Sequence, residues 1–456
     1  MGCLAAGVRA LVLFDDPFAH GYDGYYYALQ VRSLLSGAPL FDDTSAVFWL
    51  LAAVGWVLGD VVVGNKLVVC VLGALASIGG SVAAWRWWGH RGAAAVTGML
   101  FALSPLHLSV SSEFVKNAAG TAVLAWLLAA LAGSERSVRR MGVCIALAGL
   151  GLAVHKLTGV FGLVMTASVA ITWLPTVRRR QVPAWVWGAV AVTLAVVASV
   201  GVLRVVDLAR FVEGLGRFGR RMSLLDDGRL GWGEKLAVFG VHAAPLAIGV
   251  LAWRRRREAD RGLWWGLFVL SVAATAPGLP MAYDLTAWRL VLMGFVPVGL
   301  VFGWAASQRA WLGVVAVAVA LAQLPNSVSG RQQREPDYPA WSDWVDTIAH
   351  RVGDDEAVVA HRGLCGFLWA ETGRRCENFR PTGDVSSWWR VTYGFGSAQL
   401  QPYGPVVRLA PGYLLVREEA YRRFADEHDY ILLEHALNPY RERPGFVYGP
   451  RAGGSP

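Results

Sequence analysis

Two uninterrupted apolar runs constrain the fold of this chain more than any other feature of its sequence. They extend over residues 184–203 and 262–279, and neither contains a charged residue. A helix needs about 20 apolar residues to cross a hydrocarbon core that is ~30 Å thick. The runs therefore predict a polytopic helical membrane protein, and several shorter apolar segments are placed as further spans.

The overall composition agrees with this prediction and excludes one class of function. The chain has 456 residues, of which 55% are hydrophobic and only 16% charged, and its net charge is +9. Most of the excess charge lies in short basic loops between apolar segments, where the positive-inside rule accounts for it. The charge therefore does not indicate binding to nucleic acid.

The basic loops also set the topology. Both flanks of residues 141–175 are basic, so both are expected in the cytoplasm, and the segment must cross the membrane an even number of times. As one helix it would be about 50 Å long, which is too long for a single crossing. We therefore predict a helical hairpin with His155 and Lys156 at the opposite face. The same reasoning gives about eleven spans with the N-terminus inside.

The last part of the chain differs in composition. Residues 326–456 are mixed and polar, and segments 354–360 and 413–417 read as strands of a small α/β domain. We predict a membrane domain over residues 1–325 and an extracytoplasmic soluble domain over 326–456. Cys365 and Cys376 would form a disulfide if this domain faces an oxidising compartment.

The predicted outer face collects most of the acidic and polar residues. The first outer loop, residues 14–60, contains Asp23 followed by three tyrosines and an amphipathic helix that Gly37 is expected to end. We interpret Tyr25 to Tyr27 as interfacial anchors. Residues 45–59 are predicted as an interfacial helix. Other outer residues with ionisable side chains suited to binding or catalysis are Asp15, Asp16, Asp42, Asp43, Glu113, Lys116, His155, Lys156, Asp284 and Arg289.

One outer loop, residues 204–234, departs from the positive-inside rule. It contains six arginines, including Arg220 and Arg221, on the face where basic residues have no topological use. The planar guanidinium group binds phosphate through two parallel hydrogen bonds. A basic outer loop near carboxylates therefore suggests that a lipid phosphate or pyrophosphate is held near a catalytic acid or metal ion.

Taken together, the stretch from Asp23 to Gly37, the interfacial helix at 45–59, Ser104-Pro105 followed by Glu113, and the late Trp288-Arg289 resemble the GT-C fold membrane glycosyltransferases. This superfamily includes oligosaccharyltransferase catalytic subunits, protein O-mannosyltransferases and aminoarabinose transferases. The resemblance covers most of the chain through few motifs. Residues 388–394, Trp-Trp-Arg-Val-Thr-Tyr-Gly, depart from the Trp-Trp-Asp-Tyr-Gly motif of oligosaccharyltransferases, which argues against transfer to peptide asparagine.

The resemblance implies a set of site residues. Asp23 matches the acid of the first outer loop, which is a catalytic base or metal ligand in that family, and Glu113 matches the second acid. Asp16 is an alternative to Asp23, and the two carboxylates Asp23 and Glu113 with water would suit Mg²⁺ or Mn²⁺. Candidates for binding the donor phosphate are Lys116, His155, Lys156, Arg220, Arg221 and Arg289.

Each candidate also has a purely structural interpretation. Asp23 is suitably placed to cap the helix that follows it. Glu113 and Lys116 have helical spacing for a salt bridge. His155 and Lys156 could extend from the interface towards water, Arg289 could pair with Asp284, and Arg220 with Arg221 could form a solvated loop face.

The predicted function is transfer of a sugar from a polyprenyl-phosphate or polyprenyl-pyrophosphate donor to an extracytoplasmic glycan, lipid or protein acceptor. The predicted location is a bacterial inner membrane. The alternative is a transporter or flippase of a lipid-linked glycan, which is expected to carry ionisable residues near mid-bilayer and internal repeats. Here the ionisable residues concentrate at one predicted face, which favours the transferase.

Overall fold

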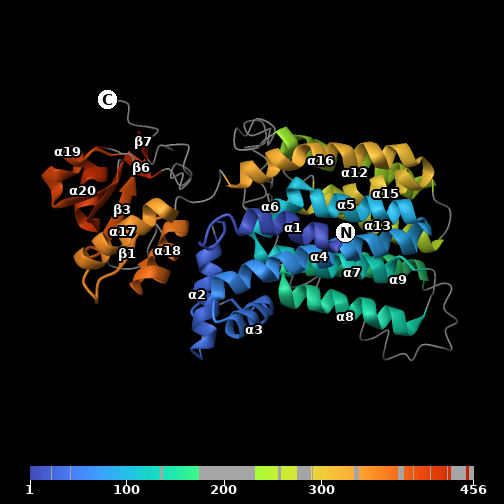
Figure 1. The fold of residues 1–456 in the computed structure, drawn as a ribbon, viewed down its shortest axis with the longest axis horizontal. Helices are drawn as coiled ribbons and strands as arrows, with labels where there is room; N and C mark the ends of the chain where they lie inside the picture. The colour runs from blue at the N-terminus through green and yellow to red at the C-terminus, as the bar shows by residue number, and fades with distance from the viewer. Residues whose placement is uncertain are drawn as a thin grey trace. The chain divides into compact units, whose positions relative to one another are not determined.

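A computed structural model describes most of the chain and divides it into two compact units (Figure 1). Unit 1 comprises residues 1–15, 43–50 and 66–330, and unit 2 comprises residues 16–42, 51–65 and 331–456. Residues of the predicted first outer loop are thus divided between the units. The described residues are 1–21, 23–37, 39–41, 43–133, 137–173, 232–254, 258–274, 289, 291–332, 338–377, 385–393, 395–410, 412–428, 430–432 and 448–450.

Unit 1 is a bundle of helices. Its core joins α7, α8, α9, α12, α13 and α15, and the strongest packing is of α8 on α9, α13 on α9 and α15 on α5 (Figure 1). The helices that belong wholly or mainly to this unit are α1 (Gly2–Leu13), α4 (Val61–Trp88), α5 (Arg91–Leu103), α6 (Pro105–Glu113), α7 (Val115–Leu131), α8 (Val138–Val154), α9 (Lys156–Trp173), α12 (Trp232–Arg254), α13 (Glu258–Ala274), α15 (Phe295–Gln308) and α16 (Ala310–Gln332).

Several of these helices are apolar enough to span a membrane. Within the described part of the chain, three are also long enough: Val61–Trp88, Val291–Gln308 and Ala310–Ser329. A fourth span is obtained if α5 and α6 are counted together as one bent crossing. The chain is thus an integral membrane protein, while the count of about eleven spans remains a prediction. The run at residues 184–203 lies outside the described residues.

The bend of 49° between α5 and α6 has a local cause. Pro105 has no N–H, so the carbonyl of Phe101 loses its helical donor, and His107 Nδ1 donates to that carbonyl at 2.7 Å instead. Ser104 caps the new helix by accepting from the His107 N–H. The break therefore ends α5 without leaving the Phe101 carbonyl unpaired, and it starts the short helix that ends at Glu113.

A buried arginine joins α1 to both sides of this break. Arg9 is fully buried, and its Nη1 donates to the carbonyls of Ala5 at 2.9 Å and Ala102 at 3.2 Å. Its Nε donates to Ser111 Oγ at 3.0 Å, on α6. Gly73 of α4 leaves room for the guanidinium, because a Cβ there would lie 2.1 Å from Arg9 Nε. Arg9 thus fixes the course of the segment that carries Glu113.

The predicted hairpin over residues 141–175 is confirmed. Helix α8 ends at Val154, His155 is extended with φ −153° and ψ 114°, and α9 starts at Lys156. The two helices pack closely, since a Cβ on Gly159 would lie 2.3 Å from the backbone nitrogen of Leu152. Glycine is therefore required where the helices meet, and the turn places His155 at one end of the bundle.

Unit 2 contains the predicted small α/β domain. Its five-stranded sheet has the order β2-β1-β3-β5-β4, in which β1 pairs in parallel with β2 and β3, and β5 is antiparallel to β3 and β4. The strands are β1 (Val358–Val359), β2 (Cys376–Glu377), β3 (Trp389–Tyr393), β4 (Val406–Ala410) and β5 (Tyr413–Arg417), and β6 (Tyr430–Leu432) pairs with β7 (Tyr448–Pro450).

The helices of unit 2 include one from the start of the chain. Helix α2 (Gly24–Leu35) packs on α18 (Arg362–Thr372), and Gly37, at φ +106°, follows α2 as predicted. The other helices are α17 (Tyr338–Arg351), α19 (Ser397–Leu400), the 3₁₀ helix η5 (Gln401–Tyr403) and α20 (Glu418–Glu427). Helix α3 (Val47–Leu58), which corresponds to the predicted interfacial helix, contributes residues to both units.

The prediction that Tyr25 to Tyr27 are interfacial anchors is wrong for two of the three tyrosines. Tyr25 is 3% exposed and Tyr27 is 2% exposed. The Tyr25 ring packs edge-on against Tyr338 at 5.1 Å and against Phe367 at 5.2 Å, within the aromatic core of unit 2. Tyr25 is buried because helices α17 and α18, which follow more than 300 residues later in the sequence, cover it.

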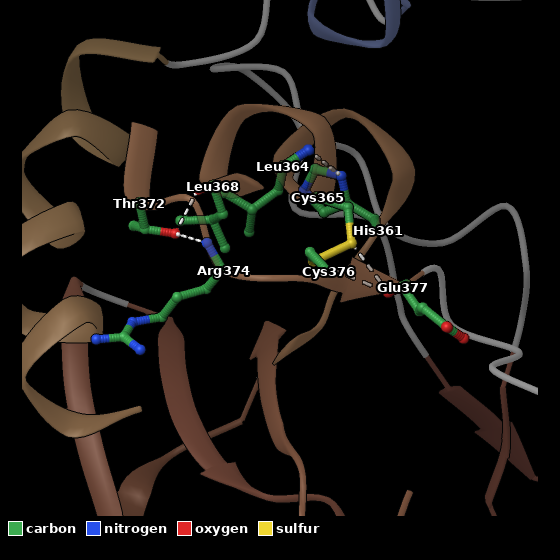
Figure 2. Close-up of a disulfide and its surroundings, with 8 residues drawn as sticks. All are labelled: His361, Leu364, Cys365, Leu368, Thr372, Arg374, Cys376 and Glu377. Carbon is green, nitrogen blue, oxygen red and sulfur yellow. Dashed lines mark hydrogen bonds between the residues drawn. A yellow bond between two sulfur atoms is a disulfide. The ribbon is translucent and has the colours of Figure 1, made fainter. Parts of the chain in front are cut away.

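The disulfide considered for Cys365 and Cys376 is present (Figure 2). It joins α18 to β2, an edge strand of the sheet. His361 caps α18 through Nδ1, which accepts from the Leu364 N–H at 3.2 Å. The disulfide and the cap together fix the start of α18 against the sheet, and the turn from Thr372 to Arg375 connects the two bridged elements.

Candidate functional site

The clearest polar cluster of unit 1 is built around Lys116, in the first turn of α7. Its ammonium forms an ion pair with Asp43, and both side chains are largely buried, at 23% and 20% exposed. The Lys116 Nζ also lies 5.8 Å from the centre of the Phe48 ring. The structure therefore gives Lys116 an ion pair with Asp43, 73 residues earlier in the chain, rather than only the helical neighbour that its spacing suggested.

Backbone contacts fix Asp43 in this position. The Asp43 carboxylate accepts from the Ser45 N–H at 3.2 Å, and the Ala46 N–H donates to the Ala153 carbonyl at 2.9 Å. The Ser45 hydroxyl donates to the Val154 carbonyl. These bonds satisfy carbonyls at the C-terminal end of α8, which would otherwise lack partners. The segment is thereby held beside the turn of the α8–α9 hairpin.

His155 lies at that turn and is half-buried. Burial lowers its pKa to about 3, and the nearby charges of Arg289 and Lys116 lower it further, while Asp43 opposes them. His155 Nδ1 accepts from the Thr158 N–H at 3.4 Å, so the neutral ring carries its proton on Nε2. His155 is thus a neutral hydrogen-bond donor near two cations.

Arg289 is the second cation of the cluster. Its guanidinium lies 4.7 Å from the centre of the Phe114 ring, a cation–π contact that holds the group in place. Its Nε is buried and has no hydrogen-bond partner among the residues that the structure describes. A buried guanidinium nitrogen without a partner is costly, so this position favours an anionic ligand.

The four residues form one electrostatic unit with a recognisable use. Lys116 and Arg289 supply positive charge, His155 supplies a neutral donor, and Asp43 balances one of the two cations. Such a set suits a phosphate group, which accepts several charge-assisted hydrogen bonds. Three of the predicted phosphate-binding residues are thus brought together. Lys156, the first residue of α9, is exposed.

The predicted acids are divided between the units. Glu113 is the last residue of α6 in unit 1 and is half-buried. Asp16 and Asp23 belong to unit 2. Asp23 is 6% exposed and precedes α2, yet its side chain makes no capping hydrogen bond to that helix. The structural interpretation of Asp23 as a helix cap is therefore wrong. Asp16 accepts from the Phe18 N–H at 2.9 Å, in a local turn.

Two residues of the cluster, Asp43 and Phe114, were not predicted from the sequence. Asp43 was counted among the outer acids without a role, and Phe114 was not considered; no local spacing links either residue to its partner. Arg220, Arg221 and Asp284 lie outside the described residues.

A metal ion would need several ligating side chains close together. In this part of the chain no three side chains of His, Cys, Asp or Glu gather closely enough to hold a metal. The two predicted ligands, Asp23 and Glu113, belong to different units. The described residues thus offer no cluster of three such ligands, and we derive no reaction step through a metal.

Comparison with solved structures identifies the fold of the chain. No protein-family profile matches the chain. No curated protein matches it either. Among solved structures, the Archaeoglobus fulgidus oligosaccharyltransferase, in complex with Zn and sulfate, matches with a TM-score of 0.52 and 13% identity. The match covers 82% of this chain and 62% of that one.

A second solved structure is similar over nearly its whole length. ArnT from Cupriavidus metallidurans, bound to undecaprenyl phosphate, matches with a TM-score of 0.45 and 15% identity, over 91% of this chain and 97% of that one. At a TM-score of 0.45 the ArnT match carries no argument, and at 13% identity the oligosaccharyltransferase match bears on the fold alone. The match to the oligosaccharyltransferase shows that the chain has the GT-C fold of membrane glycosyltransferases, as its sequence features predicted.

Proposed function

We propose that this chain is a membrane glycosyltransferase that uses a polyprenyl-phosphate or polyprenyl-pyrophosphate sugar donor. The observation that carries the proposal is the cluster of Lys116, Arg289 and neutral His155 at the turn of the α8–α9 hairpin. In a GT-C fold, a preorganised cationic cluster of this kind suits the phosphate that leaves when the sugar is transferred.

The proposed reaction is a displacement at the anomeric carbon of the donor sugar. The oxygen of an acceptor hydroxyl forms the new bond to C1, and the bond from C1 to the phosphate oxygen breaks. The leaving lipid phosphate gains negative charge, which Lys116 and Arg289 stabilise, while His155 Nε2 donates a hydrogen bond to it. The acceptor proton passes to a carboxylate base.

We assign the base to Asp23. Its carboxylate is nearly buried and does not cap α2, so capping does not account for an acid at this position. Glu113, at the end of α6, is proposed as the second acid. Asp16 is the weaker candidate because its carboxylate holds a local turn. Whether Asp23 and Glu113 also bind Mg²⁺ or Mn²⁺ is a separate prediction, which transfer assays with and without EDTA test directly.

The remaining predicted contacts belong to the same proposal. Lys156 and the arginines Arg220 and Arg221 are proposed to attract the donor phosphate or pyrophosphate. The acceptor is proposed to be an extracytoplasmic glycan, lipid or protein. Membrane lipid is proposed to surround the spans of residues 1–325, the proposed membrane domain, whose outer loop 14–60 lies outside the bilayer.

The proposed location is a bacterial inner membrane with residues 326–456 outside the cytoplasm. The bond between Cys365 and Cys376 supports the extracytoplasmic side, because disulfides persist mainly in oxidising compartments. The basic loops on the other predicted side support the same orientation.

Binding of the lipid phosphate is the most direct test of this proposal. Native mass spectrometry of the purified chain with added polyprenyl phosphate is expected to detect a complex with wild type. Lys116→Met should weaken the complex at least tenfold, because one charge-assisted contact is lost. Arg91→Met, an exposed basic residue at the start of α5, serves as the matched control. Equal binding by wild type and Lys116→Met would contradict the proposed phosphate site.

A further inference from the structure

Unit 2 contains a second candidate binding site, separate from the residues assigned above. A cavity of about 510 Å³ opens where the turn after α18 meets the start of β1 and the residue before β3. Ligand pockets commonly have volumes of about 300–1,000 Å³. The side chains that the argument uses are Asp354, Asp355, Glu356, Arg374, Arg375 and Trp388.

Nearly all of the charges at this cavity are already paired. Arg374 donates to Asp354 at 2.9 Å, and Arg375 forms an ion pair with Glu377. Glu356 accepts from Arg417 and, at 2.9 Å, from the indole Nε1 of Trp389. Asp355 is the exception, being exposed with no ion pair to another described residue. The wall is therefore strongly polar but close to neutral in charge.

Arg374 and the turn that carries it are held in fixed positions. Arg374 Nη2 donates to the Ala349 carbonyl at 2.8 Å, and the Val358 N–H donates to the Arg375 carbonyl at 2.9 Å. Figure 2 shows Arg374 two residues before Cys376, with its guanidinium pointing away from the disulfide. The disulfide thus anchors the turn that carries both arginines, and a ligand would meet hydrogen-bonding groups that are already ordered.

Two side chains of the wall can still contact a ligand. Arg374 lines the cavity, its side chain is 15% exposed, and its guanidinium carries several N–H donors. The carboxylate of Asp355 can accept hydrogen bonds from hydroxyl groups. One donor and one strong acceptor therefore accompany the paired charges.

The cavity also has one aromatic wall. Trp388 is half-buried, and the Arg375 guanidinium lies 5.6 Å from the centre of its ring, which holds the indole in place. An aromatic side chain offers an apolar surface at low entropic cost, because it has only two rotatable bonds. A ligand suited to this cavity must have an apolar face together with several hydroxyl groups.

From these features we infer that the cavity binds a short neutral carbohydrate. The C–H face of a sugar ring matches the indole of Trp388, and its hydroxyl groups match Asp355 and Arg374. A strongly anionic or cationic ligand is disfavoured, because the charges of the wall are paired with one another. That this carbohydrate is the acceptor glycan rests on the proposed function, whereas the binding itself does not.

The test measures carbohydrate binding to the full chain in amphipol, which avoids detergents with sugar headgroups. Saturation-transfer NMR is performed with trisaccharides of glucose, mannose, arabinose and N-acetylglucosamine. At least one is expected to bind, and Trp388→Ala and Asp355→Asn should each weaken that binding at least tenfold. Trp388→Phe, which keeps an aromatic wall, should weaken it less than Trp388→Ala does.

Asp343→Asn is the matched control, because Asp343 is an exposed carboxylate on α17 outside the cavity. A heparin disaccharide and spermidine report on anionic and cationic ligands. The inference is overturned if no trisaccharide binds, if either charged probe binds more tightly, or if Asp355→Asn binds like Asp343→Asn. Because binding is measured without a donor, failure here leaves sugar transfer to be judged by its own assay.

Discussion

At the scale of single residues, the pair of Lys116 and Asp43 is the most informative contact. Lys116→Met should lower the rate of sugar transfer about 10- to 100-fold, because a fixed charge near the leaving phosphate is lost. Asp43→Asn should have a smaller effect, since the cation remains but is less well positioned. Both rates are measured with purified protein and a labelled lipid-linked sugar.

Arg91→Met should transfer sugar at the wild-type rate in the same assay. If Lys116→Met were as active as Arg91→Met, Lys116 would serve only to pack the segment that carries Asp43.

His155 provides a prediction about pH. An unfolded histidine has a pKa of about 6.5, whereas the folded pKa is lowered to about 3 by burial and then by Arg289 and Lys116. The unfolded chain therefore binds the extra proton first, and the stability contributed by neutral His155 falls as the pH drops below about 6.5. His155→Asn, whose amide oxygen can replace Nδ1 as acceptor, should show a smaller decrease of thermal midpoint between pH 7 and pH 4.5.

His361 is also buried, and its pKa is lowered as well. The contribution of His155 alone is therefore the difference between the decreases of thermal midpoint in wild type and in His155→Asn. Parallel decreases in wild type and His155→Asn would contradict the buried neutral state of His155.

At the scale of elements, Arg9 holds together the break between α5 and α6. Arg9→Ala leaves the Ala102 carbonyl and the Ser111 hydroxyl without this donor and should destabilise the protein by about 3 kcal/mol or more. Gly73→Ala should be similarly harmful, because its Cβ would overlap Arg9 Nε. In an Arg9→Ala background, which lacks the Cδ and Nε that a Cβ at Gly73 would overlap, Gly73→Ala should cost much less.

Thermal midpoints of the two single variants and the double variant complete this cycle. Additive effects would show that Gly73 is required for a reason other than the space occupied by Arg9.

The disulfide is a second prediction at this scale. Cys365→Ser with Cys376→Ser should destabilise unit 2 by about 3 kcal/mol, because the bond closes a short loop between α18 and β2. Limited proteolysis of the full chain should cleave the double variant faster within residues 338–428. Alkylation of both thiols in native, unreduced protein would show that the bond is absent from the mature chain.

Local signals in the sequence were sufficient for several elements. Basic flanks around an over-long apolar run predicted the α8–α9 hairpin, and the amphipathic pattern before Gly37 predicted α2. The same signals could not reveal that Tyr25 is buried, since helices from the other end of the chain cover it. Nor could they link Asp43 to Lys116, because their contact depends on how residues 43–46 bind the end of α8.

At the scale of the whole molecule, the membrane class follows from apolar length alone, whereas the division into units does not. Residues 16–42 pack with the C-terminal part of the chain, whereas the sequence predicted them as part of the first outer loop of the membrane domain. Aromatic contacts with α17 and α18 hold helix α2 in unit 2. The periodicity of residues 24–35 does not predict these contacts. The carboxylate Asp23 thus belongs structurally to unit 2, and the cationic cluster to unit 1.

The central claim is that this chain transfers a sugar outside the cytoplasm, and mass spectrometry of envelope glycans and glycolipids tests it most directly. Cells that lack the protein are complemented with wild type, Arg91→Met or Asp23→Asn at equal expression. One sugar should disappear in the deletion strain and return with wild type and Arg91→Met, but not with Asp23→Asn. An unchanged profile in the deletion strain would contradict the transferase, and full restoration by Asp23→Asn would contradict the assigned base.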